Sequence, residues 1–310
     1  MSNEVMLVAD AGEQAGLGHI SRSTAVAVAL RCRGIETRCY AHGAAEPLER
    51  DGVRWAPLGG ERLPDSPGGV LVVDSYLLPS DELARAAGSA RLVVMHDYGS
   101  VPEDAALVVS AAAPPSDAGS GRLSGLAYAA LRPVFWGLPA RELRDHVEHV
   151  LVTTGSGNFA EVGCELAEAV GNELPGVRVT LVRGPHGTID VPSGIELLDG
   201  PDSLLEPLLA TDLVVTAGGQ TMLEAATAGT PCVALPLVDN QRRQALRLAG
   251  LGAVRLVDPP SVSEVAAAAS ELAREPEARR EMSREGQHGV DGYGALRVAF
   301  HIGRMVSQSR

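Results

Sequence analysis

The residues best suited to chemistry near the start of the chain are Gly16, Gly18 and His19, followed by Arg22. They lie between an apolar run and a stretch with helical periodicity. Glycines at such a junction let a ligand approach the backbone. The positive end of a helix dipole disfavours a protonated imidazole, so His19 is a candidate general base at neutral pH. The alternative interpretation is a polar loop histidine beside a helix cap.

A second glycine pair, Gly218 and Gly219, joins an apolar run to a helical stretch and is followed by Gln220 and Thr221. Backbone N–H groups at a helix start can hold a diphosphate. Glu224 is placed to accept hydrogen bonds from the two hydroxyls of a ribose. The spacing of Thr221 and Glu224 is equally typical of a capping box, which needs no ligand.

Amide side chains follow a later apolar run, at Asn240 and Gln241. They can donate and accept hydrogen bonds, so they suit the hydroxyl groups of a sugar. The alternative is structural, because Asp239 or Asn240 can cap the helix that starts there.

Two further sets of polar residues have open interpretations. Asp74, His96 and Asp97 are expected at strand ends, where they can position a sugar or His19, or simply end a strand. His146 and His149 are spaced like metal ligands on one helix face, but a solvated face is the preferred interpretation of their charged surroundings.

The elements that position these residues alternate between apolar runs and helical stretches, which predicts parallel sheets covered by helices. Strands are expected over residues 5–9, 37–41, 70–73, 92–95 and 107–109, then over 150–153, 177–182, 213–216 and 232–235. Helices are expected over 21–33, 80–87, 160–170 and 293–306, a loop over 111–127, and a bridge over 137–149.

The length of 310 residues suits two domains. The restart of the pattern predicts two α/β domains, residues 1–140 and residues 141–310, with a last helix able to pack back on the first domain.

Composition and charge exclude several classes of function. The net charge of −13 argues against nucleic acid or an anionic membrane surface as a partner. The chain has no lysine, which excludes a Schiff base and the lysine of a P-loop. The spacing after Gly18 does not fit a nicotinamide fingerprint, which needs a third glycine and a later acidic residue.

The chain shows no apolar run of roughly 20 residues, so no membrane span is expected. Its four cysteines are scattered without a CxxC pair, which indicates free thiols and a cytoplasmic location.

Taken together, the motifs resemble the UDP-sugar hydrolases of pseudaminic acid biosynthesis and the related spore-coat polysaccharide proteins. The resemblance rests on the order of segments over nearly the whole chain. These segments are Gly16 to Arg22, Asp74 to Tyr76, Gly125 to Phe135, Ala217 to Glu224, Asp239 to Gln241 and Val290 to Gly294.

The resemblance implies the GT-B architecture, an α/β fold with two facing Rossmann-like domains, mainly parallel sheets and the donor in the cleft. The lipid II-forming N-acetylglucosaminyltransferase shares this fold and a similar second-half motif. In the family, the histidine matched by His19 is the base, which implies that residues 1–140 are the N-terminal Rossmann-like domain with the acceptor side and the catalytic histidine. The second half holds uridine diphosphate, with the carboxylate matched by Glu224 on the ribose, which implies that residues 141–310 are the C-terminal Rossmann-like domain that binds the nucleotide-sugar.

The chain departs from the family pattern at three places. A Gly-Gly-x-Asp motif is replaced around Gly155, an Asp-Asp pair by His96-Asp97, and an asparagine-containing strand end by a segment that starts at Ser110. These departures indicate a changed sugar or acceptor more than a changed nucleotide.

The predicted function is cleavage of the sugar–diphosphate bond of a UDP-sugar, with an N-acetylated amino sugar as the expected donor. The glycosyl group is transferred with inversion to a small acceptor. The alternative is a hydrolase with water as acceptor, and a third possibility is a nucleotide-sugar-binding protein without turnover. Neither a metal nor another cofactor is expected.

The sequence assigns catalysis to His19 and groups the other candidates by ligand. The expected nucleotide-sugar contacts are Gly16, Gly18, Arg22, Gly155, Gly218, Gly219, Gln220, Thr221, Glu224, Asn240 and Gln241. The expected sugar or acceptor contacts are Asp74, Tyr76, Asp97, Tyr128 and Arg132, and Arg22 or Arg132 is expected to assist the departing diphosphate.

Overall fold

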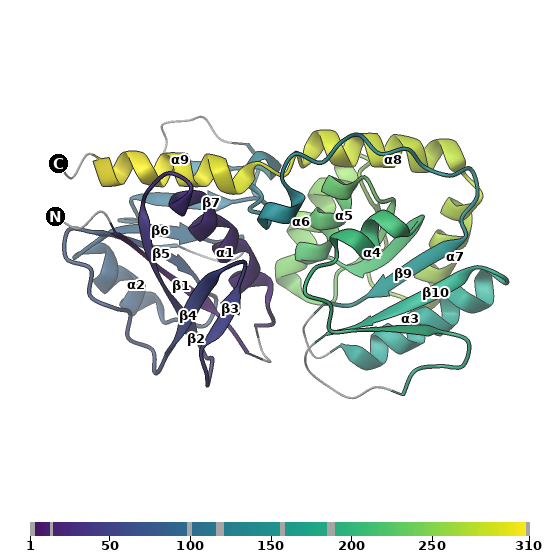
Figure 1. The fold of residues 1–310 in the computed structure, drawn as a ribbon, viewed down its shortest axis with the longest axis horizontal. Helices are drawn as coiled ribbons and strands as arrows, with labels where there is room; N and C mark the ends of the chain where they lie inside the picture. The colour runs from purple at the N-terminus through teal and green to yellow at the C-terminus, as the bar shows by residue number, and fades with distance from the viewer. Residues whose placement is uncertain are drawn as a thin grey trace. The chain divides into compact units, whose positions relative to one another are not determined.

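The computed structural model describes residues 4–12, 15–97, 101–115, 121–155, 159–184 and 190–307 (Figure 1). The chain divides into two compact units. Unit 1 contains Met1–Trp136 and Gly292–Arg310, and unit 2 contains Gly137–Asp291. The chain therefore leaves unit 1 once and returns to it for its last helix.

Unit 1 alternates strands and helices and closes with the last helix of the chain. Its strands are β1 (Glu4–Asp10), β2 (Glu36–His42), β3 (Leu48–Arg50), β4 (Val53–Leu58), β5 (Val70–Asp74), β6 (Arg91–Met95), β7 (Leu107–Ser110) and β8 (Arg122–Ser124). Its helices are α1 (Gly18–Arg31), α2 (Ser80–Ala87), the 3₁₀ turns η1 (Leu126–Tyr128) and η2 (Pro133–Phe135), and α9 (Gly294–Ser307).

The described strands of unit 1 form one sheet in the order β3-β4-β2-β1-β5-β6-β7-β8. Among these strands only the β3–β4 pair is antiparallel, and the other neighbours are parallel. All five residues of β5 are buried. A central parallel strand is covered by helices on both faces, so its run of valines and leucines follows from its place in the sheet.

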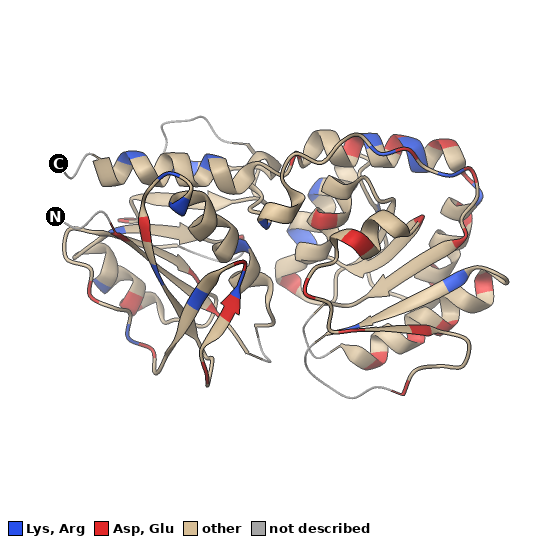
Figure 2. Ribbon diagram, in the orientation of Figure 1, with Lys and Arg blue, Asp and Glu red and all other residues tan. Residues whose placement is uncertain are grey.

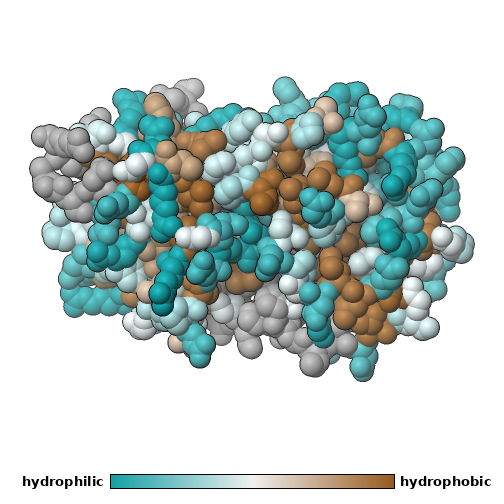
Figure 3. Space-filling view, in the orientation of Figure 1, coloured by the Kyte–Doolittle hydropathy of each residue, from teal (hydrophilic) through white to brown (hydrophobic). Residues whose placement is uncertain are grey.

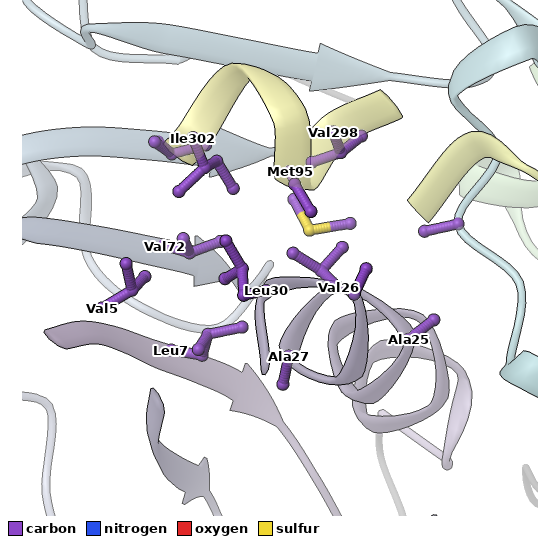
Figure 4. Close-up of a cluster of buried hydrophobic side chains, with 14 of the residues drawn as sticks. Val5, Leu7, Ala25, Val26, Ala27, Leu30, Val72, Met95, Val298 and Ile302 are labelled. Atoms are coloured by element: carbon purple, nitrogen blue, oxygen red, sulfur yellow. The ribbon is translucent and has the colours of Figure 1, made fainter. Parts of the chain in front are cut away.

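Helix α1 is buried on nearly all sides because α9 packs beside it over the same face of the sheet, where α9 also contacts β5 (Figure 1). Figure 4 shows Val26 and Leu30 of α1 beside Val298 and Ile302 of α9, with Val72 of β5 in the same cluster. Small side chains elsewhere on α1 let the helices approach closely. The return of the chain to unit 1 thus completes the core of that unit.

Unit 2 contains a second, wholly parallel sheet among its described strands. The strands are β9 (His149–Thr153), β10 (Arg178–Arg183), β11 (Glu196–Asp199), β12 (Leu213–Ala217), β13 (Cys232–Leu235) and β14 (Arg255–Leu256), in the order β11-β10-β9-β12-β13-β14. The helices are α3 (Ala160–Glu173), α4 (Leu205–Ala210), α5 (Gln220–Ala228), α6 (Asp239–Gly250), α7 (Val262–Ala273) and α8 (Pro276–Gly289).

The core of unit 2 lies between its sheet and the paired helices α3 and α7. Leu166 of α3 and Val265 of α7 are fully buried, as are Val152 and Val215 of the central strands. Branched aliphatic residues dominate this core, as the low aromatic content of 3% requires.

Several sequence-based expectations need correction. The segment 111–127 was expected as a loop, but its described part contains β8 and most of η1. The short strands β3, β4 and β8 escape a periodicity search because they lie toward the edges of the sheet and expose polar residues. Helix α1 begins at Gly18, three residues earlier than expected. The sequence does not signal this start, because no side chain caps it.

The described helices are all too short or too polar to span a lipid bilayer. The four cysteines are free thiols, of which Cys39 and Cys232 are buried and Cys32 is exposed. The face drawn in Figure 3 mixes polar and apolar surface on both units.

We predict that Gly294→Ala destabilises the protein by about 1–3 kcal/mol or more, because a Cβ there overlaps the backbone of Ala129 and overpacking displaces its neighbours. Chemical denaturation measures the change in the free energy of unfolding. Gly59→Ala is the matched control in unit 1, since its Cβ meets nothing within 4 Å. Equal stability of the two variants would contradict the close packing of α9.

Candidate functional site

The two sheets each have one point where the order of the strands reverses. It lies between β1 and β5 in unit 1 and between β9 and β12 in unit 2. Open parallel sheets bind ligands beyond the carboxyl ends of their strands at this point. The loops there contain most of the residues selected from the sequence, so the topology and the motifs indicate the same two edges.

In unit 1 a buried carboxylate organises the edge. Asp74 ends β5 and is completely buried. Its Oδ1 lies 2.6 Å from His19 Nδ1, and its two oxygens accept from Arg22 Nη2 and Nε at 2.5 and 2.7 Å. Ser23 Oγ also donates to Oδ2 at 2.9 Å. The positions i, i+3 and i+4 put all three partners on one face of α1.

The charge state of Asp74 fixes the tautomer of His19. Burial by itself would raise the pKa of Asp74, but the charge of Arg22, then His19, holds this pKa well below its ordinary value. The carboxylate is therefore ionised and can only accept, so His19 Nδ1 carries the proton. The lone pair then lies on Nε2, as a general base requires.

A second carboxylate, Asp97, extends the cluster. Arg22 Nη1 donates to Asp97 Oδ2 at 2.5 Å, while Ser110 Oγ and the Ala112 N–H donate to Oδ1 at 3.0 and 3.1 Å. Two carboxylates and one guanidinium leave a formal charge of −1 when His19 is neutral. Arg22 binds both carboxylates and so holds Asp74 in place. Its contact with the nucleotide-sugar stays a prediction.

Tyr76 links this cluster to a second histidine–aspartate pair. Its ring meets His19 edge-on at a centroid distance of 4.8 Å, and its backbone N–H donates to Asp10 Oδ2 at 2.7 Å. Asp10 Oδ1 lies 2.9 Å from Nδ1 of His42. Sequence reasoning missed Asp10 and His42, although both are polar residues at the end of a predicted strand.

Two expected acceptor contacts lie apart from this cluster. Arg132 donates to both oxygens of Asp51, at 2.7 and 2.6 Å. Asp51 precedes β4, at the amino edge of the sheet, opposite to His19. Tyr128 meets His301 of α9 edge-on. These contacts indicate structural roles, and for Arg132 the placement corrects the expectation of assistance beside His19.

In unit 2 the edge is built from glycines and neutral polar groups. Helix α5 begins at Gln220 after Gly219, without a side-chain cap. Thr221 is inside the helix rather than at its cap, so the capping-box interpretation is wrong. Packing alone favours glycine at position 218, since a Cβ there would lie 3.1 Å from Cβ of Gln241.

Two oxygens at this edge are buried without a hydrogen-bond partner among the described residues. They are Thr216 Oγ1, near the end of β12, and Asn240 Oδ1, in the first turn of α6. Gln241 Oε1 accepts from the Leu237 N–H at 2.9 Å. Neither Asp239 nor Asn240 caps α6, whose cap residue is Val238. Buried polar groups are normally paired, so two unpaired oxygens indicate a polar ligand here.

The remaining candidates are placed as follows. Gly155 follows β9 at the switch point with a positive φ of 84°, a conformation that favours glycine. Glu224 is buried within α5. His149 is not on a solvated helix face but begins β9, where its Nε2 lies 2.9 Å from Thr180 Oγ1. The described residues contain no group of three His, Cys, Asp or Glu side chains that could hold a metal.

Comparison with known proteins finds solved structures of similar fold but no match by sequence. No protein-family model matches the chain, and no curated protein matches it. The solved MurG of Acinetobacter baumannii superposes with a TM-score of 0.62 at 16% identity, covering 97% of this chain and 99% of MurG. The calicheamicin glycosyltransferase CalG4 gives 0.63 at 14% identity, with 99% of each chain covered.

A third structure is the glycosyltransferase SsfS6 of Streptomyces sp. SF2575, solved in complex with thymidine diphosphate. It gives a TM-score of 0.59 at 16% identity, covering 98% of this chain and 99% of SsfS6. At these identities the likeness establishes the fold. The chain has the GT-B fold of these glycosyltransferases, with a mainly parallel sheet in each unit.

We predict that Asp74→Asn lowers the free energy of unfolding at pH 7 by about 3–5 kcal/mol, because it leaves the partly buried Arg22 without its main counter-charge. The pKa of Asp74 is depressed in the folded state, so the wild type holds this stability above the ordinary aspartate pKa of 3.8 and loses it as the pH falls further. The difference between the proteins therefore shrinks in acid.

Denaturant titrations from pH 7 to pH 3 measure this difference. Asp65→Asn is the control, because Asp65 pairs with Arg85 at the surface and its loss changes stability little. A difference that stays constant with pH would contradict the depressed pKa of Asp74.

Proposed function

We propose that this chain transfers a glycosyl group from a UDP-sugar to a small acceptor with inversion at the anomeric carbon, and that the sugar is an N-acetylated amino sugar. The observation that carries this proposal is the His19–Asp74 pair at the switch point of unit 1. The GT-B fold and the glycosyltransferase activity named for the similar structures support it.

The acceptor reacts at His19. Nε2 of His19 takes the proton of an acceptor hydroxyl while its oxygen attacks the anomeric carbon. The bond from that carbon to the diphosphate oxygen breaks, and the bonding electron pair leaves with the nucleoside diphosphate. A single displacement of this kind inverts the anomeric centre. Asp74 stabilises the imidazolium that forms.

The departing diphosphate is assigned to the start of α5. Helix dipoles aimed at developing charge stabilise it without reorganisation, which removes the need for a metal in this proposal. Asn240 and Thr216 offer buried oxygens to the ligand, and Glu224 is assigned to the ribose hydroxyls. SsfS6, which was solved with thymidine diphosphate, makes a nucleoside diphosphate a reasonable ligand for the same fold.

We predict that His19→Ala lowers turnover at least a hundredfold, as expected when a general base contributing about 10²–10⁴ is removed. The affinity for UDP changes little, because His19 belongs to unit 1 and the nucleotide is assigned to unit 2. The measurement is release of UDP from a panel of UDP-sugars, with thymidine diphosphate donors included, with and without candidate acceptors.

His288→Ala is the control for that panel, since His288 lies exposed on α8. Release that requires an acceptor supports transfer. Release without an acceptor that still depends on His19 would identify a hydrolase. UDP binding without release from any donor would indicate a binding protein and sink the catalytic proposal.

We also predict that Glu224→Gln weakens UDP binding about tenfold, the value expected for loss of hydrogen bonds to a charged group. The wild type should bind UDP more tightly than 2′-deoxyuridine diphosphate, and the variant should lose this preference. Calorimetric titration measures both affinities. Glu206→Gln, at an exposed position of α4, is the control. An unchanged preference would remove Glu224 from the ribose site.

A further inference from the structure

The residue that the mechanism above leaves unused is His96, which follows β6 at the carboxyl edge of the unit 1 sheet. Its backbone N–H donates to the carbonyl of Val109 at 2.8 Å, so the β6–β7 pairing holds its position. The next residue, Asp97, is bound by Arg22, Ser110 and Ala112. His96 is therefore presented by a rigid part of the site.

The side chain of His96 is unusual because both ring nitrogens are buried and neither has a hydrogen-bond partner among the described residues. Polar atoms buried in folded proteins are normally paired, and an unpaired nitrogen costs stability. By contrast, His19, His42 and His149 each have a hydrogen-bonding partner at a ring nitrogen. Two unpaired nitrogens on one ring indicate that a partner is missing.

The ring nitrogens of His96 can change direction without movement of the backbone. His96 is partly exposed, although its two nitrogens are not. A half-turn about the Cβ–Cγ bond exchanges the ring nitrogens with ring carbons, and this torsion is broad and roughly two-fold.

The charge state of His96 decides which ligand fits. Burial, and then the charge of Arg22, lowers the pKa of His96 below its ordinary value, so its ring is neutral at pH 7. A neutral imidazole has one donor and one acceptor. A hydroxyl group also has both, whereas a carboxylate only accepts and an ammonium only donates.

The position of His96 relates it to the reacting group. The ring of Tyr76 meets His19 at 4.8 Å and His96 at 4.9 Å, edge-on in both cases. One aromatic ring thus separates the two imidazoles. A ligand that touches both imidazoles needs two hydroxyls several ångströms apart, on a rigid frame that can lie against the ring of Tyr76. A pyranose carries its hydroxyls in this way.

We propose that His96 recognises the acceptor by binding one hydroxyl of a pyranose whose reacting hydroxyl lies at His19. This proposal rests on the proposed function, since it names the class of acceptor for the same reaction. It makes His96 a specificity-determining residue that contacts the acceptor and leaves the proton transfer to His19.

The kinetic test uses His96→Phe, which keeps an aromatic ring and removes both nitrogens, and His96→Gln, which keeps a donor and an acceptor. With the acceptor found in the panel above, His96→Phe should raise the acceptor KM at least tenfold and change kcat less than threefold. His96→Gln should restore part of the loss. An unchanged KM in His96→Phe, or equal KM values in both variants, would overturn the proposal.

A binding test separates this proposal from the reaction itself. Nitrogen-15 spectra of protein labelled at its eight histidines identify His96 as the signal missing in His96→Phe. The probes are the methyl pyranosides of glucose, galactose, mannose and N-acetylglucosamine, added without a nucleotide. We expect the His96 signals to shift saturably with at least one probe, and His96→Phe to bind that probe at least tenfold more weakly.

If no probe shifts the His96 signals, the proposal fails even when UDP release proves the reaction. If a probe binds through His96 while no donor releases UDP, the proposed reaction fails and the pyranose site stands. If His96→Phe does not fold, His96→Gln identifies the His96 signal instead, and the wild-type spectra still show whether a probe shifts it.

Discussion

The buried charge of Asp74 is the constraint on which the candidate site depends. A carboxylate with no exposed surface, placed at the end of a central strand, needs compensation by charge and by hydrogen bonds. Helix α1 supplies both through His19, Arg22 and Ser23. Because these residues share one helical face, a single contact fixes the rotation of α1 over the sheet and directs Nε2 of His19 away from Asp74. Figure 2 shows that charged residues are spread along the ribbon of both units.

The packing of α1 explains how such a cluster is kept in place. The helix packs on the sheet and, along its flank, on α9, so it cannot rotate without disturbing the core (Figure 4). Close contacts at Gly294 and Gly303 seat α9, where a Cβ would meet Ala129 or Ile35. The last segment of the chain therefore supports the geometry of residues near its beginning.

The corresponding edge of unit 2 is built from different chemical groups. Its edge has glycines, a helix start and neutral oxygens in place of an ion cluster. Such a site can hold an anion without introducing a competing carboxylate network, which suits the overall charge of −13. Unit 1, by contrast, places a histidine against a buried, ion-paired carboxylate at its edge.

The sequence by itself determined the class of fold and the central strands, because parallel strands buried on both faces are continuous apolar runs, as over residues 70–73. It also selected His19 and the two glycine segments, since glycines between a strand and a helix are a local signal. The strand orders, and hence the two switch points, were decided only by the tertiary structure. So were the pairing of His19 with Asp74 across 55 residues, the use of Arg22 between two carboxylates, the placement of Arg132 at the opposite edge, and the unpaired nitrogens of His96. These features depend on which strand ends meet in space, and neither residue type nor local periodicity encodes that neighbourhood.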